Sequence, residues 1–134
     1  MIGILIVTHG KFGEEMLESA QAIVGRQENI STVKLPSEEA PEMLKNRLDG
    51  MLSEMDRGQG VLIMTDMLGG TPCNICLPYA RTKKVSIVSG INLYMILAAI
   101  VNRNKMELDE LTQKVVESGQ KNIADVKKKF LDKK

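Results

Sequence analysis

The only histidine of the sequence, His9, comes directly after a run of apolar residues and directly before Gly10. A neutral imidazole carries a proton on one ring nitrogen and leaves the other nitrogen free to act as a nucleophile. Asp66 follows a second apolar run. If its carboxylate accepts a hydrogen bond from the protonated nitrogen, it fixes the tautomer that presents the free nitrogen. The pair therefore predicts a histidine that carries a phosphoryl group, with Asp66 as its orienting partner.

A glycine-rich turn follows Asp66 and leads into a predicted helix. It contains Gly69, Gly70 and Thr71. Such a turn offers backbone N–H groups, a helix N-terminus and a hydroxyl, which are the groups that bind a phosphate. Phosphoryl transfer requires little from a protein beyond positioning and electrostatics. These three residues are therefore the candidate phosphate-binding residues.

Short β-branched runs alternate with helical patterns along the chain, which is typical of βαβ units. We expect four strands, at residues 2–8, 30–35, 60–66 and 85–89. This pattern predicts an α/β fold of three layers, with a mostly parallel four-stranded sheet between helices.

The helical segments are marked by their apolar spacing and by their ends. The first helix stops at Gly25, the second starts near Pro41, the third is capped by Thr71, and Asn92 caps a nearly all-apolar helix over residues 93–101. A last helix covers residues 108–130, with a possible break at Gly119. Its inward positions are predicted to be Leu111, Val115, Val116, Ile123 and Val126.

Parallel strands joined by right-handed crossovers bring all their carboxyl ends to one edge of the sheet. With the strand order 2-1-3-4 of flavodoxin-like folds, the order in which successive strands are added reverses between the first and third strands, and a crevice opens there. His9 and Asp66 then extend from neighbouring strands, which lie about 4.8 Å apart. We expect one hydrogen bond to join them.

The composition restricts the other function classes. The 134 residues fit a single domain, residues 1–134. A net charge of +1 and 3% aromatic residues argue against nucleic acid as a partner. No apolar run reaches the roughly 20 residues that span a bilayer, so we expect a cytoplasmic protein without direct membrane insertion. We also expect no cofactor and no metal.

Four ordered segments of the sequence resemble the IIA domain of the mannose family of the bacterial phosphoenolpyruvate:sugar phosphotransferase system. They lie at residues 6–10, 25–29, 65–74 and 89–93. The sequence departs from the family pattern at Thr71, where serine is common, at Cys73, where phenylalanine is usual, and at Tyr94, where proline is often found. Thr71 keeps the hydroxyl, whereas the other two departures concern specificity.

The resemblance implies that His9 accepts a phosphoryl group from the carrier protein HPr and passes it to a IIB domain, for uptake of a mannose-family sugar. It assigns Asp66 as the partner of His9. The amides of Gly70 and Thr71 and the Thr71 hydroxyl become phosphate contacts. It also implies a homodimer, which the apolar helix over residues 93–101 independently favours, with an extra edge strand exchanged between subunits in some members.

Four alternatives remain open at this stage. A stand-alone regulatory phosphocarrier, or the phosphotransfer subunit of a dihydroxyacetone kinase, would carry similar residues. The CxxC pair Cys73 and Cys76 could form a redox couple. A receiver-type signalling domain would be phosphorylated on Asp66, but the loop after the first strand lacks the acidic residues that hold its Mg²⁺. The sugar is not specified by the sequence.

Overall fold

The computed structural model describes residues 1–132. Its four strands form one sheet in the order β2-β1-β3-β4, and all three neighbouring pairs are parallel. The strands are β1 (Gly3–His9), β2 (Ile30–Leu35), β3 (Val61–Thr65) and β4 (Val85–Val88). The predicted fold class and strand order are therefore confirmed, and His9 is the last residue of β1.

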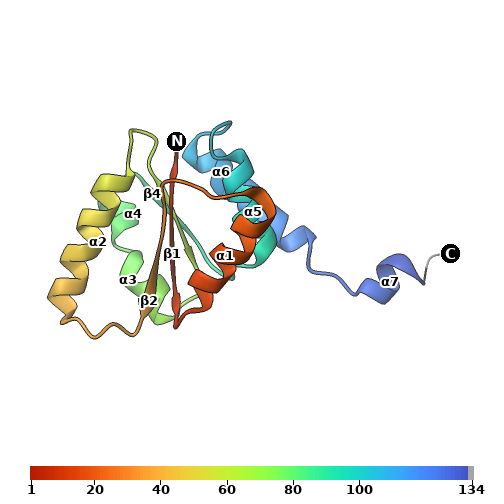
Figure 1. Cartoon of the computed structure of the whole chain (residues 1–134), viewed down its shortest axis with the longest axis horizontal. Helices are drawn as coiled ribbons and strands as arrows, with labels where there is room; N and C mark the ends of the chain where they lie inside the picture. The colour runs from red at the N-terminus through yellow and green to blue at the C-terminus, as the bar shows by residue number, and fades with distance from the viewer. Residues whose placement is uncertain (133–134) are drawn as a thin grey trace.

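Helices cover both faces of the sheet (Figure 1). One face carries α1 (Phe12–Val24), α5 (Leu93–Asn102) and α6 (Leu108–Lys121). The other face carries α2 (Pro41–Met55), α3 (Thr71–Cys76) and α4 (Tyr79–Thr82), and α7 (Val126–Phe130) stands away from this body. The described residues of one chain form no fifth strand.

The side chains of β1 alternate between two apolar cores, as the period of a strand requires. Ile4 and Ile6 pack with the helices α1, α5 and α6. Leu5 and Val7 pack on the opposite side with α2, α3 and α4. All four are completely buried, so β1 is a central strand with a rigid end at His9.

Several predicted helix ends agree with the structure. Gly25 ends α1 with φ 91°, and Asn92 caps α5 by accepting a hydrogen bond from the Met95 N–H. Thr71 was expected to cap α3, and this was wrong. Gly70 occupies the capping position in extended conformation, and Thr71 is the first helical residue without a side-chain cap. A hydroxyl at that position is not needed to start the helix.

The last predicted helix was too long. α6 ends at Lys121, and it continues through Gly119 without a break. Ile123 and Val126 are 76% and 67% exposed, and Val116 is also exposed, so their predicted inward positions were wrong. The segment after Lys121 leaves the body instead of packing on it (Figure 1). No helix in the described part of the chain is long and apolar enough to cross a membrane.

Candidate functional site

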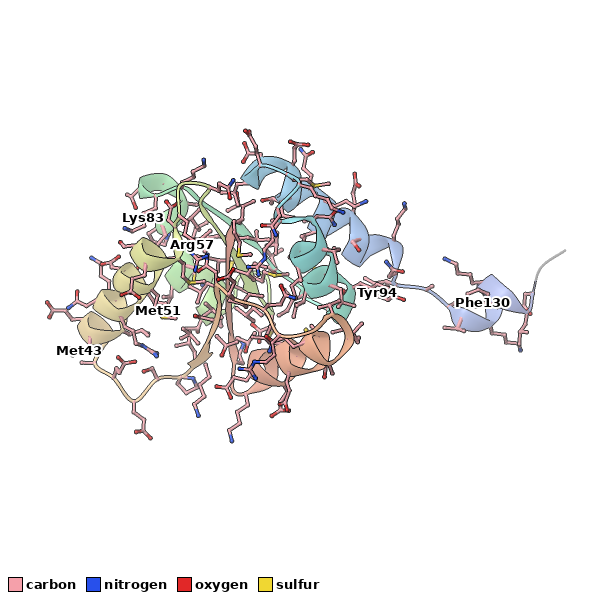
Figure 2. The ribbon with its side chains drawn as sticks, turned by 45° about the horizontal axis from the view of Figure 1, so that its top comes forward. Met43, Met51, Arg57, Lys83, Tyr94 and Phe130 are labelled. Carbon is pink, nitrogen blue, oxygen red and sulfur yellow. The ribbon has the colours of Figure 1, made fainter. Side chains whose placement is uncertain are left out.

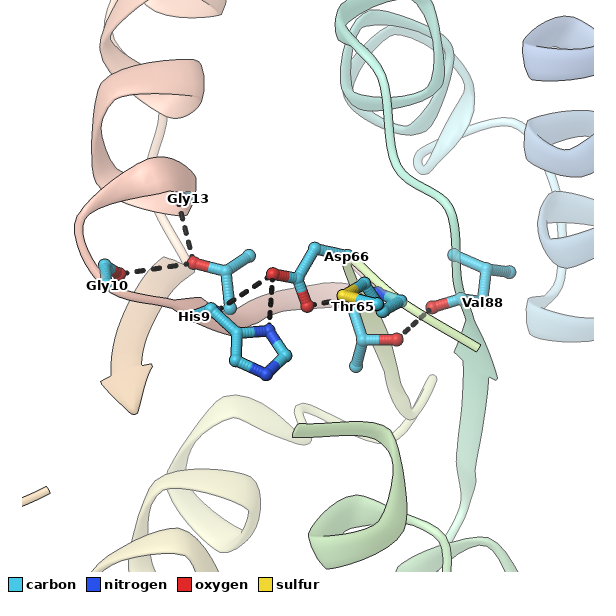
Figure 3. Close-up of polar contacts among 8 residues, drawn as sticks. His9, Gly10, Gly13, Thr65, Asp66 and Val88 are labelled. Atoms are coloured by element: carbon cyan, nitrogen blue, oxygen red, sulfur yellow. Dashed lines mark hydrogen bonds and ion pairs between the residues drawn. The ribbon is translucent and has the colours of Figure 1, made fainter. Parts of the chain in front are cut away.

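His9 and Asp66 meet at the carboxyl edge of the sheet, as the strand order predicts. The His9 Nδ1 atom lies 2.8 Å from Asp66 Oδ2, and the His9 backbone N–H donates to the same oxygen at 2.9 Å (Figure 3). Asp66 Oδ1 accepts a hydrogen bond from the Met67 N–H at 3.0 Å. Both carboxylate oxygens are therefore held by donors, and the imidazole has a fixed orientation.

Asp66 is ionised at physiological pH. Burial raises its pKa, but hydrogen bonds from the His9 backbone, the His9 ring and its own backbone, with the charge of the His9 ring, outweigh burial. The net pKa lies below the ordinary value of 3.8. Because a carboxylate only accepts hydrogen bonds, Nδ1 of His9 must carry the proton in this contact. The lone pair of a neutral ring is then on Nε2.

The His9 ring is accessible, whereas its partner is not. The side chain of His9 is 46% exposed and that of Asp66 is 10% exposed. In Figure 3 the second ring nitrogen of His9 points away from Asp66. The site can therefore present a nucleophilic nitrogen to a group that arrives from another molecule.

The glycine turn lies beside the imidazole. A Cβ atom on Gly70 would lie 3.2 Å from His9 Cε1, so this position has little room for a side chain. The Gly70 N–H donates to the Met67 carbonyl oxygen at 3.1 Å. Among residues 1–132, neither the N–H nor the hydroxyl of Thr71 has a hydrogen-bond partner. Gly69 adopts φ 76°, which a glycine tolerates without strain.

Two threonines near the site were missed by the sequence reasoning. Thr8 directly precedes His9, and its Oγ1 accepts a hydrogen bond from the Gly13 N–H at 2.9 Å. Thr65 directly precedes Asp66, and its Oγ1 donates to the Val88 carbonyl oxygen at 3.1 Å (Figure 3). Both side chains are buried. The repeated threonine directly before each site residue was the available signal.

The cysteine pair lies one turn beyond Thr71 on α3. Cys73 is partly exposed and Cys76 is buried. Burial, with a smaller contribution from Cys73, raises the pKa of Cys76 to about 12. A thiol with this pKa stays protonated, so the structure offers no activated redox cysteine at position 76. In the described part of the chain, no group of three His, Cys, Asp or Glu side chains is placed to hold a metal ion.

Comparisons with protein families and with individual proteins point to the same group of proteins. The family model described as "PTS system fructose IIA component" matches residues 3–116. The chain is 30% identical over 134 residues to the mannose-specific EIIAB component of the PTS of Escherichia coli (strain K12). This match covers 98% of the chain but 42% of the relative, so the chain spans less than half the length of that protein.

Two further similarities cover most of both proteins. The fructose-specific EIIA component of Bacillus subtilis (strain 168) is 28% identical over 112 residues, which are 83% of this chain and 77% of the relative. The crystal structure of a phosphotransferase system EIIA from Streptococcus agalactiae superposes with a TM-score of 0.84 at 31% identity. That superposition covers 94% of this chain and 98% of the other.

Proposed function

Because the chain belongs to the EIIA family of the mannose, fructose and sorbose phosphotransferase systems, we propose that it carries a phosphoryl group on Nε2 of His9. The donor is phospho-HPr and the acceptor is a IIB domain. The observation that carries this proposal is the 2.8 Å contact between His9 Nδ1 and the ionised Asp66, beside an exposed ring.

The contact explains how a neutral imidazole can accept the group. The Nε2 lone pair attacks phosphorus as the bond from phosphorus to HPr breaks, so the phosphoryl group moves from HPr to Nε2 and the HPr group leaves with the electron pair of that bond. The His9 ring gains positive charge because Nδ1 keeps its proton. Asp66 stabilises that charge at hydrogen-bond distance. In a second displacement, a nucleophile of the IIB domain attacks phosphorus as the bond from phosphorus to Nε2 breaks, and His9 returns to its neutral form.

We propose that Gly69, Gly70 and Thr71 bind the phosphoryl oxygens. The support is the place of Gly70 beside the His9 ring, with Gly69 and Thr71 on either side of it in the chain, and the unpartnered N–H and hydroxyl of Thr71. Thr71 contributes most in this proposal, because the Gly70 N–H is already bonded to Met67. Two donors on one residue suit a group with several acceptor oxygens.

We propose that the protein works in the cytoplasm and that its phosphoryl group serves the uptake and phosphorylation of a mannose-family sugar. Relatives of this chain are described as specific for mannose, fructose and sorbose, so the sugar is left open. The IIA domain handles only the phosphoryl group. A regulatory phosphocarrier or a dihydroxyacetone kinase subunit would differ in the acceptor protein, and adding a IIB domain to the phosphorylated chain separates these roles.

The test is incubation with phosphoenolpyruvate, Enzyme I and HPr, followed by mapping of the phosphate. We expect one acid-labile phosphate per chain and none in His9→Ala. Asp66→Ala should accept phosphate slowly, while Asp109→Ala, an exposed acidic residue on α6, should behave as the wild type. Acid-stable, hydroxylamine-sensitive label on Asp66 would refute the proposal. So would a normal rate in Asp66→Ala.

We also propose that the protein is a homodimer. Tyr94 and Val101 lie two turns apart on α5 and are 54% and 51% exposed, and Ile123 and Val126 on the C-terminal segment are more exposed still. Figure 2 shows Tyr94 on the side from which this segment extends. A second copy of the chain packed against this surface would remove these apolar side chains from water.

Sedimentation of the full chain tests the assembly. We expect a mass of two 14.8 kDa chains for the wild type. Val101→Glu together with Ile123→Glu should shift the equilibrium towards the monomer, whereas Val116→Glu on α6 serves as the exposed apolar control. A wild type that sediments as a monomer at micromolar concentration contradicts the proposal.

A further inference from the structure

We propose that Thr8 and Thr65 are positioning residues, whose buried hydroxyls hold the ends of β1 and β3 so that the His9 imidazole and the Asp66 carboxylate meet at hydrogen-bond distance. Each threonine directly precedes one member of the pair. The effect on transfer rate rests on the proposed function, but the effect on the geometry of the pair does not.

The burial of these hydroxyls requires an explanation. The buried polar or charged side chains of residues 1–132 are Thr8, Thr65 and Arg103, with 1%, 0% and 1% exposure. A buried hydroxyl is costly unless it is hydrogen-bonded, and valine would fill the same space in a strand without that cost. Both threonines lie at the edge where the site is formed. Their hydroxyls must therefore be needed for the bonds they make.

The Thr8 hydroxyl fixes the part of the chain that follows His9. Its Oγ1 accepts the Gly13 N–H, which belongs to the first turn of α1, and lies 3.4 Å from the Gly10 carbonyl oxygen. The first N–H groups of a helix have no partner within the helix, and Lys11 provides no side-chain cap. Thr8 thus anchors α1 to the end of β1. His9 and Gly10 lie between these two anchored points.

A close approach at the same place reinforces this anchor. A Cβ atom on Gly13 would lie 2.9 Å from Thr8 Oγ1 and 2.8 Å from Ile6 Cγ2. The helix therefore approaches the strand more closely than a residue with a Cβ atom would allow. On the other side, the Gly10 N–H donates to the Leu35 carbonyl oxygen at 2.8 Å. The end of β1, which carries His9, and the Gly10 that follows it are therefore held by α1 and by β2.

The Thr65 hydroxyl performs the equivalent task for Asp66. The last registered pair of β3 and β4 is Met64 with Val88. One residue later, Thr65 Oγ1 donates to the Val88 carbonyl oxygen, and the Thr65 carbonyl oxygen accepts the Ile91 N–H at 3.2 Å. These bonds tie the end of β3 to the chain that follows β4. Asp66 therefore extends from a strand end that is held by two hydrogen bonds of Thr65.

The required accuracy explains why two anchors matter. The contact between Nδ1 and Oδ2 is 2.8 Å, and a displacement of about 1 Å removes a hydrogen bond of this kind. Without the contact, neither tautomer of the ring is favoured by Asp66. A misplacement of that size can cost about 100-fold in rate even when the displaced group is intact.

The first measurement is the nitrogen chemical shifts of the His9 ring in the unphosphorylated full chain, which report the tautomer. The variants are Thr8→Val and Thr65→Val, with Thr8→Ser and Thr65→Ser as conservative variants that keep the hydroxyl. Thr112→Val is the matched control, because Thr112 Oγ1 donates to the Leu108 carbonyl oxygen on α6. We expect the proton on Nδ1 in the wild type, the serine variants and the control, and a mixture of tautomers in both valine variants.

The second measurement is transfer from phospho-HPr. We expect the valine variants to lose about 10-fold to 100-fold in kcat with KM for HPr unchanged, and the serine variants to recover most of it. Valine variants with the tautomer and rate of the control would overturn the proposal, as would lower stability with an unchanged tautomer. If one valine variant does not fold, the tautomer and the transfer rate of the other valine variant test the proposal. A wild type that takes no phosphate from HPr refutes the proposed function, while the ring shifts still test the positioning.

Discussion

Asp66 Oδ2 accepts two hydrogen bonds from one residue, the backbone N–H of His9 and its ring Nδ1–H. One donor is on the backbone of His9 and the other is on its ring. A single oxygen that accepts from both fixes the rotation of the imidazole as well as its tautomer. Replacing Asp66 with alanine removes the charge together with three accepted hydrogen bonds, two from His9 and one from the Met67 N–H. An asparagine removes the charge and replaces one of the two acceptor oxygens with a donating NH2 group, but it keeps one oxygen that can accept from His9. Comparing the two variants therefore separates the loss of the remaining acceptor oxygen from the loss of the charge.

The pKa of Asp66 makes a prediction about stability and pH. Its folded-state pKa is below 3.8, so the ionised form contributes stability that is present above pH 3.8 and is lost as the pH falls through the folded-state pKa. The side-chain amide of the Asp66→Asn variant does not titrate. We expect the difference in unfolding free energy between wild type and variant to shrink as the pH falls below about 3.8.

Urea unfolding at a series of pH values measures this difference. Asp109→Asn is the control, because its exposed carboxylate lies on α6 and not at the site. A difference for Asp66→Asn that grows towards low pH would mean that the folded-state pKa lies above the unfolded one, against the hydrogen bonds described for this carboxylate.

At the scale of the elements, two helical glycines are expected to respond oppositely to alanine. A Cβ atom on Gly119 of α6 would lie 2.6 Å from Met95 Cγ and 2.7 Å from its Sδ, so Gly119→Ala should destabilise the fold by about 1–3 kcal/mol. Gly50 of α2 has open space around it, and Gly50→Ala should stabilise the fold by about 0.5–1 kcal/mol. Urea unfolding of both variants tests the pair, and effects of the same sign would contradict it.

The elements that position the site could be predicted because their signals are local. The second strand was predicted with its observed bounds, Ile30–Leu35, and the alternation of strands and helices indicated the order of the sheet. That order alone places His9 beside Asp66, because parallel strands end at the same edge. The contact between His9 and Asp66 was therefore predictable from topology and residue type.

The remaining errors depend on contacts that a sequence does not display. Gly119 was expected to break a helix, yet it allows α6 to approach Met95 of α5 closely. Ile123 and Val126 continue the apolar spacing of α6, but nothing within residues 1–132 buries them. The roles of Thr8 and Thr65 depend on partners in other elements, so their hydroxyls were not distinguished from ordinary strand residues.

At the scale of the whole molecule, Arg103 joins segments that are far apart in the chain at the sheet edge opposite His9. Its guanidinium donates to the carbonyl oxygens of Ile2, Glu28 and Asn29 and to Gln27 Oε1, while its Nε has no partner among residues 1–132. The side chain is 1% exposed. Arg103 thus fixes the start of β1 and the loop before β2 to the end of α5.

Replacing this side chain should affect stability without affecting the site. We expect Arg103→Met to lower the unfolding free energy by about 3–5 kcal/mol, because several buried carbonyl oxygens lose their donor at once. Arg47→Met removes an exposed ion pair with Glu39 and should cost less than about 1 kcal/mol. Urea unfolding compares the two variants. The folded Arg103→Met protein should still take phosphate from HPr at the wild-type rate, because His9 lies at the other end of β1. A slower rate in fully folded protein would show that the two edges are coupled, and a stability loss equal to that of Arg47→Met would show that the buried contacts contribute little.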